Sequence, residues 1–171
     1  MRLFVPLCLL FAAGTFAADY KTVLDDLDKL DASLTTLSND VKDVVSGVPG
    51  LPIALQVQVD AVNLDKVLLR AIENVNASPD FGIIGSPSVS LKLVALAPKI
   101  TSTIGAVGGK SKEFGDFGPI VLASLYQLRQ DTSTFADGVV DRLDPLYAAV
   151  APIIVNAIDS SFNGAIGKYG G

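Results

Sequence analysis

The chain has 171 residues, half of them hydrophobic and 18% charged, with a net charge of −5 and neither histidine nor tryptophan. Its single cysteine is Cys8, near the N-terminus. Without histidine, neither a Ser–His–Asp triad nor a Cys/His zinc site can form. An acidic chain also lacks the basic surface that nucleic-acid binding requires. We therefore expect a protein that is not an enzyme, with no catalytic residue, no metal, no cofactor and no nucleic-acid partner.

The first 17 residues have the pattern of a secretory signal peptide. Met1 and Arg2 give a positive start, the run from Leu3 to Phe11 is apolar, and small residues follow up to Ala17. The run is shorter than the roughly 20 residues of a transmembrane anchor. Removal of residues 1–17 leaves 154 residues (171 minus 17), which we expect to form one domain, 18–171, without cysteine. The pattern predicts a secreted protein, extracellular or in a cell wall, without a transmembrane anchor.

Residues 20–48 carry a sustained heptad pattern, which predicts a long amphipathic helix. One position of the heptad is occupied by Tyr20, Leu27, Leu34, Val41 and Val48, and the other by Val23, Leu30, Leu37 and Val44. We expect the aspartates and lysines between them, Asp26 among these, to face water. Gly47, Pro49 and Pro52 should end the helix.

Residues 53–75 fit two patterns at first sight. Ile53, Leu55, Val57 and Val59 alternate as in a strand, whereas the later apolar residues share one helical face. The absence of glycine and proline between Pro52 and Pro79 favours a single helix.

The remaining chain predicts three more helices. Residues 78–88 form a break, and Ser88 could cap a third helix, 89–107, with Pro98 kinking it. A fourth helix covers about 110–130, with a possible interruption at 115–119, and a fifth covers 134–166, bent at Pro145 and Pro152. The fold class is therefore all-α, an antiparallel bundle of about five helices.

The apolar faces of the last two helices are the first candidate site. One interpretation is that they only form the core of the bundle. The other is that they exceed what five helices need for a core, and either line a cavity or open onto a surface. We take as candidate ligand-binding residues Leu125, Leu128, Leu146, Tyr147, Val150, Ile154 and Ile158. Arg129 is the candidate partner for a ligand carboxylate. Lys66, Arg70, Lys92 and Lys99 are weaker candidates, for which solvated surface charge is the alternative.

Two further features have surface interpretations. The aspartates at 25–31 and 137–144 lack the spacing of a calcium loop, so a solvated face explains them better than a metal site. Asn76-Ala77-Ser78 is an N-glycosylation sequon, and Pro79 after it should reduce its use. The C-terminus has no hydrophobic tail of the kind that precedes lipid anchoring.

Several degenerate motifs resemble a known family. Lys112-Glu113-Phe114 is followed by a Leu-x-x-Leu helix at 125–128, a Thr-x-x-Phe turn at 132–135 and a final Phe-x-x-Ala-Ile step at 162–166. With the opening helix VLDDLDKLDASLTTLSNDV, these segments are similar to the fungal hydrophobic surface binding protein A family, which includes cell-wall galactomannoproteins. The resemblance covers about residues 20 to 167.

This resemblance implies a secreted fungal protein that coats hydrophobic surfaces. Some relatives recruit polyester-degrading esterases, and related galactomannoprotein domains enclose fatty acids in a five-helix bundle. The expected function is thus binding of a hydrophobic surface, or of a fatty acid or other lipid in a bundle cavity, with a secreted esterase as a further partner. The alternative is a structural cell-wall mannoprotein or adhesin without a lipid ligand; a hydrolase is disfavoured by the missing histidine.

Overall fold

The computed structural model describes residues 18–171, and the predicted signal peptide lies outside the described residues. All regular structure in the described part is helical, which confirms the all-α class. The elements are α1 (Tyr20–Lys42), η1 (Val48–Gly50), α2 (Leu51–Ala77), α3 (Gly82–Gly109), α4 (Ser111–Phe114), η2 (Gly115–Phe117), α5 (Gly118–Val140), α6 (Pro145–Ala148) and α7 (Ala151–Lys168).

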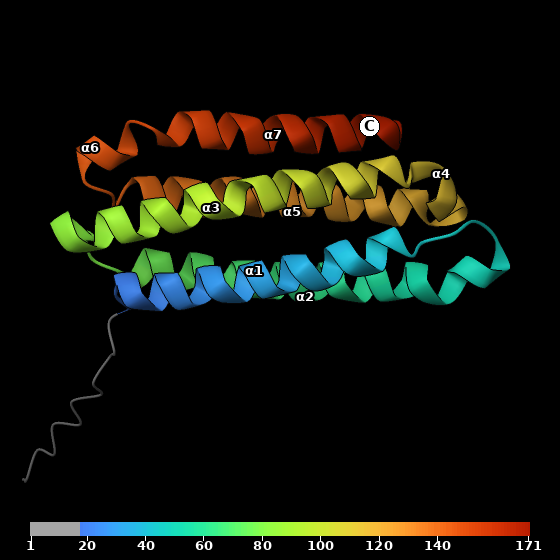
Figure 1. The fold of residues 1–171 in the computed structure, drawn as a ribbon, viewed down its shortest axis with the longest axis horizontal. Helices are drawn as coiled ribbons and strands as arrows, with labels where there is room; N and C mark the ends of the chain where they lie inside the picture. The colour runs from blue at the N-terminus through green and yellow to red at the C-terminus, as the bar shows by residue number, and fades with distance from the viewer. Residues whose placement is uncertain (1–17) are drawn as a thin grey trace, which may run out of the picture.

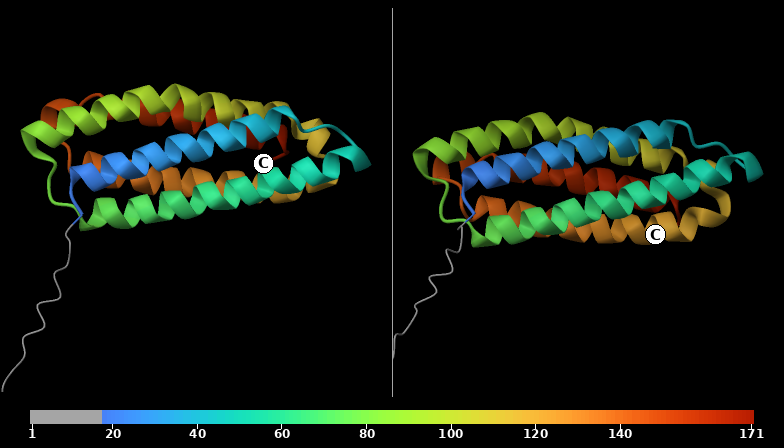
Figure 2. Two further views of the ribbon diagram at one scale, coloured as in Figure 1. Left: turned by 60° about the horizontal axis from the view of Figure 1, so that its bottom comes forward. Right: turned by 90° about the horizontal axis from the view of Figure 1, so that it is seen from below.

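The five long helices form a closed ring when the bundle is viewed along its axis. Contacts join α1 to α2, α2 to α5, α5 to α7, α7 to α3, and α3 back to α1. Each long helix runs antiparallel to the one before it in the chain (Figures 1 and 2). The ring order differs from the chain order, so α3 lies between α1 and α7, which run in the same direction as α3. A ring of five helices encloses an interior of its own, since no helix fills the centre.

The predicted heptad pattern of α1 is the face that the helix buries. Val23, Leu27, Leu30, Leu34, Leu37 and Val41 are all buried. Asp19 caps the helix, because its Oδ1 accepts hydrogen bonds from the backbone N–H groups of Lys21 and Thr22, each at 3.0 Å. The Thr22 bond holds the pKa of Asp19 below its usual range.

Two details of the α1 prediction were wrong. The helix ends at Lys42, and Gly47 turns the chain with φ of 80°, so Val48 is 79% exposed instead of continuing the buried pattern. Asp26 does not face water: it is 1% exposed, and it accepts hydrogen bonds from Lys29 Nζ at 3.0 Å and Asn74 Nδ2 at 2.6 Å. Position 26 lies beside the heptad face, where α2 covers it and supplies Asn74.

The third helix begins earlier than predicted. The helix α3 starts at Gly82, so Pro87 and Ser88 lie inside it and the break is limited to residues 78–81. A proline at position 87 removes the bond to the Ile83 carbonyl, and this loss is tolerated because Ile83 is exposed to water. Ser88 does not cap the helix; its Oγ donates a hydrogen bond to the carbonyl of Ile84 at 3.2 Å.

The predicted boundary between the last two helices was also wrong. The helix α5 continues through residues 131–134 to Val140, and the turn falls at 141–144. No glycine or proline interrupts 131–137, and the Thr134 hydroxyl donates to the Gln130 carbonyl at 3.1 Å within the helix. Pro145 and Pro152 stand in the first turns of α6 and α7, where a missing N–H costs nothing, so they begin helices instead of bending one.

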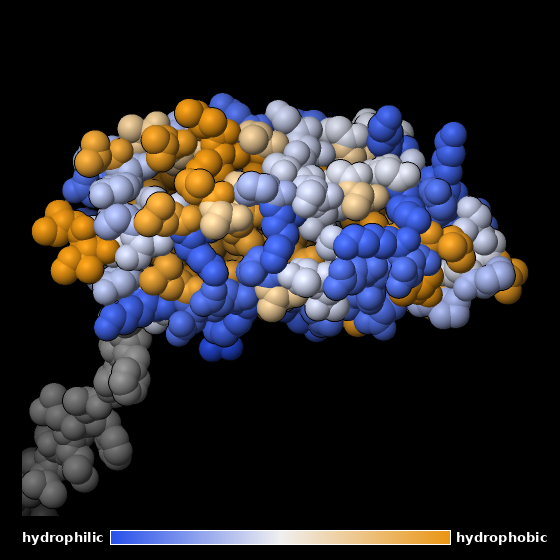
Figure 3. Space-filling model, in the orientation of Figure 1, coloured by the Kyte–Doolittle hydropathy of each residue, from blue (hydrophilic) through white to orange (hydrophobic). Residues whose placement is uncertain are grey.

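The surface carries an uneven distribution of apolar side chains. Figure 3 shows them gathered at one end of the face in view, over α6 and the beginnings of α3 and α7. By length and composition alone, two segments of the described residues could cross a membrane: Gly82–Gly109 and Pro145–Lys168, in each of which the most apolar 18-residue window has a mean hydropathy of 1.3. These two segments pack against each other in the bundle.

Candidate functional site

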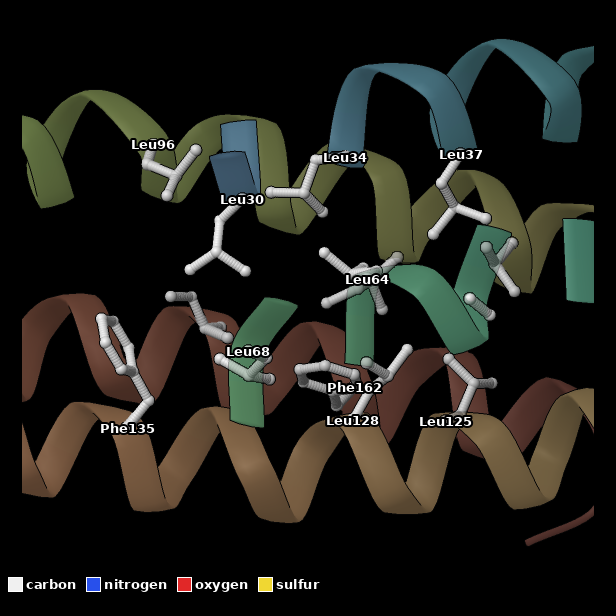
Figure 4. Close-up of a cluster of buried hydrophobic side chains, with 14 of the residues drawn as sticks. Leu30, Leu34, Leu37, Leu64, Leu68, Leu96, Leu125, Leu128, Phe135 and Phe162 are labelled. Atoms are coloured by element: carbon white, nitrogen blue, oxygen red, sulfur yellow. The ribbon is translucent and has the colours of Figure 1, made fainter. Parts of the chain in front are cut away.

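An elongated apolar cavity runs through the middle of the ring. Its volume is about 230 Å³, and all five long helices contribute to its wall. Leu30, Leu34, Leu64, Leu68, Leu96 and Phe135 point into the space between the helices (Figure 4). A single water needs about 10–15 Å³ by the same measure, so the cavity has room for a large ligand.

The cavity is long as well as apolar. Its wall on α5 runs from Leu125 to Val140, and 15 residues at 1.5 Å each give a length of about 22 Å. On α7 the wall runs from Ala151 to Phe162. A long, narrow, apolar space suits an extended acyl chain better than a compact polar ligand.

Polar groups line the cavity mainly along the boundary between α5 and α7, which we call the seam. Of its 28 lining residues six are polar, and five of these six belong to α5 or α7: Arg129, Thr132, Ser133, Asn156 and Asp159. The seam between α5 and α7 is also the one with the sparsest contacts in the ring. The polar group of a ligand would therefore find its partners here.

An ion pair closes this seam. Arg129 Nε donates a hydrogen bond to Asp159 Oδ1 at 2.7 Å, and Asn163 Nδ2 donates to the other oxygen at 2.9 Å. Arg129 holds the pKa of Asp159 below its usual range, with Asn163 acting in the same direction. Since Nε takes the aspartate, the two Nη groups of Arg129 can serve a ligand carboxylate.

A shallow hollow on the outside of the bundle meets the cavity at this pair. The hollow and the cavity share Arg129, Ser133 and Asp159 in their walls. The ion pair thus lies where the cavity and the hollow meet, and its side chains are 36% and 44% exposed.

Thr103 on α3 is the sixth polar residue of the cavity wall, and sequence reasoning missed it. It is 1% exposed, and its Oγ1 has no hydrogen-bond partner among the described residues. A buried hydroxyl without a partner costs stability. The signal was a lone threonine on the face of α3 that also carries Leu96, Ile100 and Val107.

The structure divides the predicted site residues into two groups. Leu125, Leu128, Ile154, Ile158 and Arg129 lie in the wall of the cavity. Leu146, Tyr147 and Val150 lie outside it, on α6 and the turn after it, and Leu146 is 74% exposed. The second group was assigned to the face of one continuous helix, whereas the break before α7 leaves Leu146 and Val150 on the surface and Tyr147 half-buried against the core outside the cavity wall.

The weaker basic candidates lie outside the cavity wall. Lys92 pairs with Asp28, and Lys99 pairs with Asp31 and donates to the Thr35 hydroxyl at 3.0 Å, so both join α3 to α1. Lys66 and Arg70 are exposed on α2. Asn76 of the sequon is exposed in the last turn of α2. Within residues 18–171, no group of three or more Asp, Glu, His or Cys side chains could hold a metal ion.

The fold and the site define an all-α bundle of five long helices around an apolar cavity. The family model of hydrophobic surface binding protein A matches residues 20–141, and the chain belongs to this family. A comparison with curated proteins gives no match.

Solved structures share the fold over nearly the whole chain. The structure of AfMP4p in complex with palmitic acid has 23% identity and a TM-score of 0.82, covering 88% of this chain and 99% of that one. Ligand binding domain 1 of the Penicillium marneffei MP1 protein, complexed with arachidonic acids, has 16% identity and a TM-score of 0.80, covering 88% and 98%. Domain 2 of the same protein, complexed with multiple arachidonic acids, has 15% identity and a TM-score of 0.81, covering 90% and 97%.

Proposed function

We propose that this chain binds a long-chain fatty acid in the cavity, with the acyl chain along the bundle axis and the carboxylate at Arg129. The observation that carries the proposal is the cavity itself. It is long and mostly apolar, and its polar residues gather mainly where α5 meets α7. The palmitic and arachidonic acids bound by structures of the same fold support it. The protein acts by holding its ligand and performs no covalent step.

The energetics are adequate for this role. A sixteen-carbon chain gains about 0.8 kcal/mol for each methylene buried, or roughly 12 kcal/mol in total. The cost of association removes about half of this gain or more. The balance of about 6 kcal/mol or less corresponds to a dissociation constant of tens of micromolar or weaker.

Ligand extraction tests the proposal directly. Mass spectrometry of an organic extract of the purified protein should show a fatty acid in near-stoichiometric amount, and the delipidated protein should bind palmitic acid in a fluorescence displacement titration. A scaffold that serves only as a wall mannoprotein or adhesin would give neither result. Absence of both would contradict the proposal.

The position of the carboxylate is tested by Arg129→Gln. Loss of a charge-assisted hydrogen bond of about 1.5–3 kcal/mol should weaken palmitic acid binding by about 10- to 100-fold. Binding of the palmitic acid methyl ester should change little, since the ester carries no charge. Arg70→Gln, at an exposed position on α2, is the matched control and should leave both affinities unchanged.

Secretion and esterase recruitment extend this proposal. Residues 1–17 support secretion, and N-terminal sequencing of protein from a culture medium should begin at Ala18. Recruitment of a secreted polyester-degrading esterase follows from the family resemblance. It predicts that the esterase binds to a polyester film more strongly when the film has first been coated with this protein.

A further inference from the structure

The most exposed large apolar side chains of the described residues gather at one end of the bundle. We call it the apolar end and define it as residues 82–91 of α3 with the segment 145–157 of α6 and α7. Six large apolar side chains of the described residues are at least two-thirds exposed. Five of them belong to the apolar end (Figure 3): Ile83, Ile84, Leu91, Leu146 and Ile153. The sixth, Val48, lies beyond the far end of α1.

The segment 145–157 is apolar on two opposite faces. It contains no charged residue and no buried one. Ala151, Ile154 and Val155 line the cavity on its inner side, whereas Leu146 and Ile153 are 74% exposed. Helical surface that is apolar on both sides is typical of a protein core or of lipid contact, and here Asn156 is the one amide side chain between Pro145 and Ala157. The outer side of the segment 145–157 is covered by no other part of the described bundle.

The two most apolar segments of the described residues, Gly82–Gly109 and Pro145–Lys168, are mostly not buried within the bundle. The most apolar window of Pro145–Lys168 has 11% of its residues buried, and that of Gly82–Gly109 has 28%. A core helix of equal hydropathy would be mostly buried. Because α3 and α7 pack side by side, their uncovered apolar residues lie on neighbouring helices.

The distribution of charge around the apolar end indicates which kind of surface it can bind. No charged residue occurs at 82–91 or 145–158. The charges that flank these segments in the chain are Asp80, Asp144 and Asp159, which are acidic, and Lys92, which is paired with Asp28. The chain as a whole carries a net charge of −5, so an anionic surface would repel it. An electrically neutral lipid surface presents no such repulsion and covers apolar side chains favourably.

We propose that the apolar end docks onto a neutral lipid surface, such as a zwitterionic phospholipid bilayer, and that the acyl ligand passes between lipid and cavity at this end. The passage of the ligand rests on the proposed function, whereas the docking onto lipid does not. The segment 145–157 is the part of the cavity wall that can move at the lowest cost, because none of its residues is buried. Docking brings that segment against the lipid from which a ligand is taken.

Flotation with phosphatidylcholine vesicles tests the docking. We would use the chain from Ala18 onward, which contains every element of the described bundle. The double variant Leu146→Ser/Ile153→Ser should lower the fraction of protein that floats with the vesicles by at least tenfold. Val48→Ser, which removes an equally exposed apolar side chain elsewhere, should leave that fraction unchanged. Thermal unfolding should be unaffected in all variants, since surface substitutions change stability little.

A fluorescent label shows which end enters the lipid. The chain from Ala18 has no cysteine, so Leu146→Cys and Val48→Cys each give a single attachment point for an environment-sensitive fluorophore. On addition of phosphatidylcholine vesicles, emission should shift to the blue for the label at 146 and stay constant for the label at 48. Equal shifts at both positions, or equal flotation of wild type and double variant, would overturn the proposal.

The remaining outcomes separate the two proposals. Fatty-acid binding in solution without vesicle binding overturns the docking and leaves the cavity function intact. Docking without fatty-acid binding sustains the docking surface and overturns the cavity function. If light scattering shows a dimer that the double variant dissociates, and no vesicle binding occurs, the apolar end is an interface between two copies and the lipid proposal is wrong.

Discussion

The carboxyl groups of Asp65 on α2 and Asp131 on α5 meet across the boundary between the two helices. Asp131 is buried and accepts a hydrogen bond from Gln127 Nε2 at 2.7 Å, while Asp65 Oδ1 is buried without a partner among the described residues. Burial, and then the proximity of Asp131, raise the pKa of Asp65 to about 6. Below that pH the Asp65 carboxyl is neutral; above it, Asp65 carries a charge that burial and the neighbouring Asp131 both disfavour.

Asp65→Asn should therefore change how stability depends on pH. The pKa of Asp65 is raised on folding, so its stabilising contribution is complete below about 3.8 and is lost as the pH rises through 6. Relative to the variant, the wild type should lose melting temperature between pH 4 and pH 7.5. Asp25→Asn, at an exposed carboxylate of α1, controls for the loss of one negative charge. Parallel pH profiles for wild type and Asp65→Asn would contradict the pairing.

Thr103→Val should stabilise the ligand-free protein. Valine has nearly the same shape as threonine and removes a buried hydroxyl that has no partner, so we expect the free energy of unfolding to rise by about 1 kcal/mol. Chemical denaturation of the delipidated protein measures the change. If the carboxylate is held at Arg129, the gain should persist in the palmitate-loaded protein. A gain that vanishes on loading would place the carboxylate at Thr103 instead.

The buried face of α1 could be predicted from the sequence because its heptad positions all lie on one side of a single uninterrupted helix and all face the interior of the bundle. The boundary after α5 was misplaced at residues 130–134, although Asp144 followed by Pro145, a capping residue before a first-turn proline, marks the start of α6. The faces of Leu146 and Val150 depended on that boundary and were assigned to the wrong side. Proline spacing indicated bends, whereas Pro145 and Pro152 mark two helix starts.

The site was predictable only in part for a related reason. Leu125, Leu128 and Arg129 share one face of α5, so their inward direction follows from periodicity. Which helix stands opposite them depends on the ring order, in which α7 and not α3 closes the seam. Asp159, the partner of Arg129, is 30 residues away in the chain, and no local pattern connects the two.

Arg142→Ala should destabilise the end of the bundle that carries the start of α3. The guanidinium of Arg142 donates to three carbonyls, those of Asn76, Gly138 and Ser78, each at 2.9 Å, and so joins the end of α2 to α5. Losing these charge-assisted bonds should lower the free energy of unfolding by about 2–4 kcal/mol in urea titrations. Arg142→Lys should recover only part, because an ammonium lacks the planar fork. Arg70→Ala, at an exposed position of α2, should change stability by less than about 0.5 kcal/mol.

Gly108→Ala and Gly105→Ala should have opposite effects, although the two glycines are one helical turn apart on α3. A Cβ at position 108 would lie 2.9 Å from Cα and 3.1 Å from Cβ of Ala165, so α3 and α7 would have to separate where they close the cavity ring. We expect a loss of about 1–3 kcal/mol in the free energy of unfolding. A Cβ at position 105 meets nothing within 4 Å, so alanine there should add about 0.5–1 kcal/mol. Two stabilised variants would show that α3 and α7 do not pack this closely in solution.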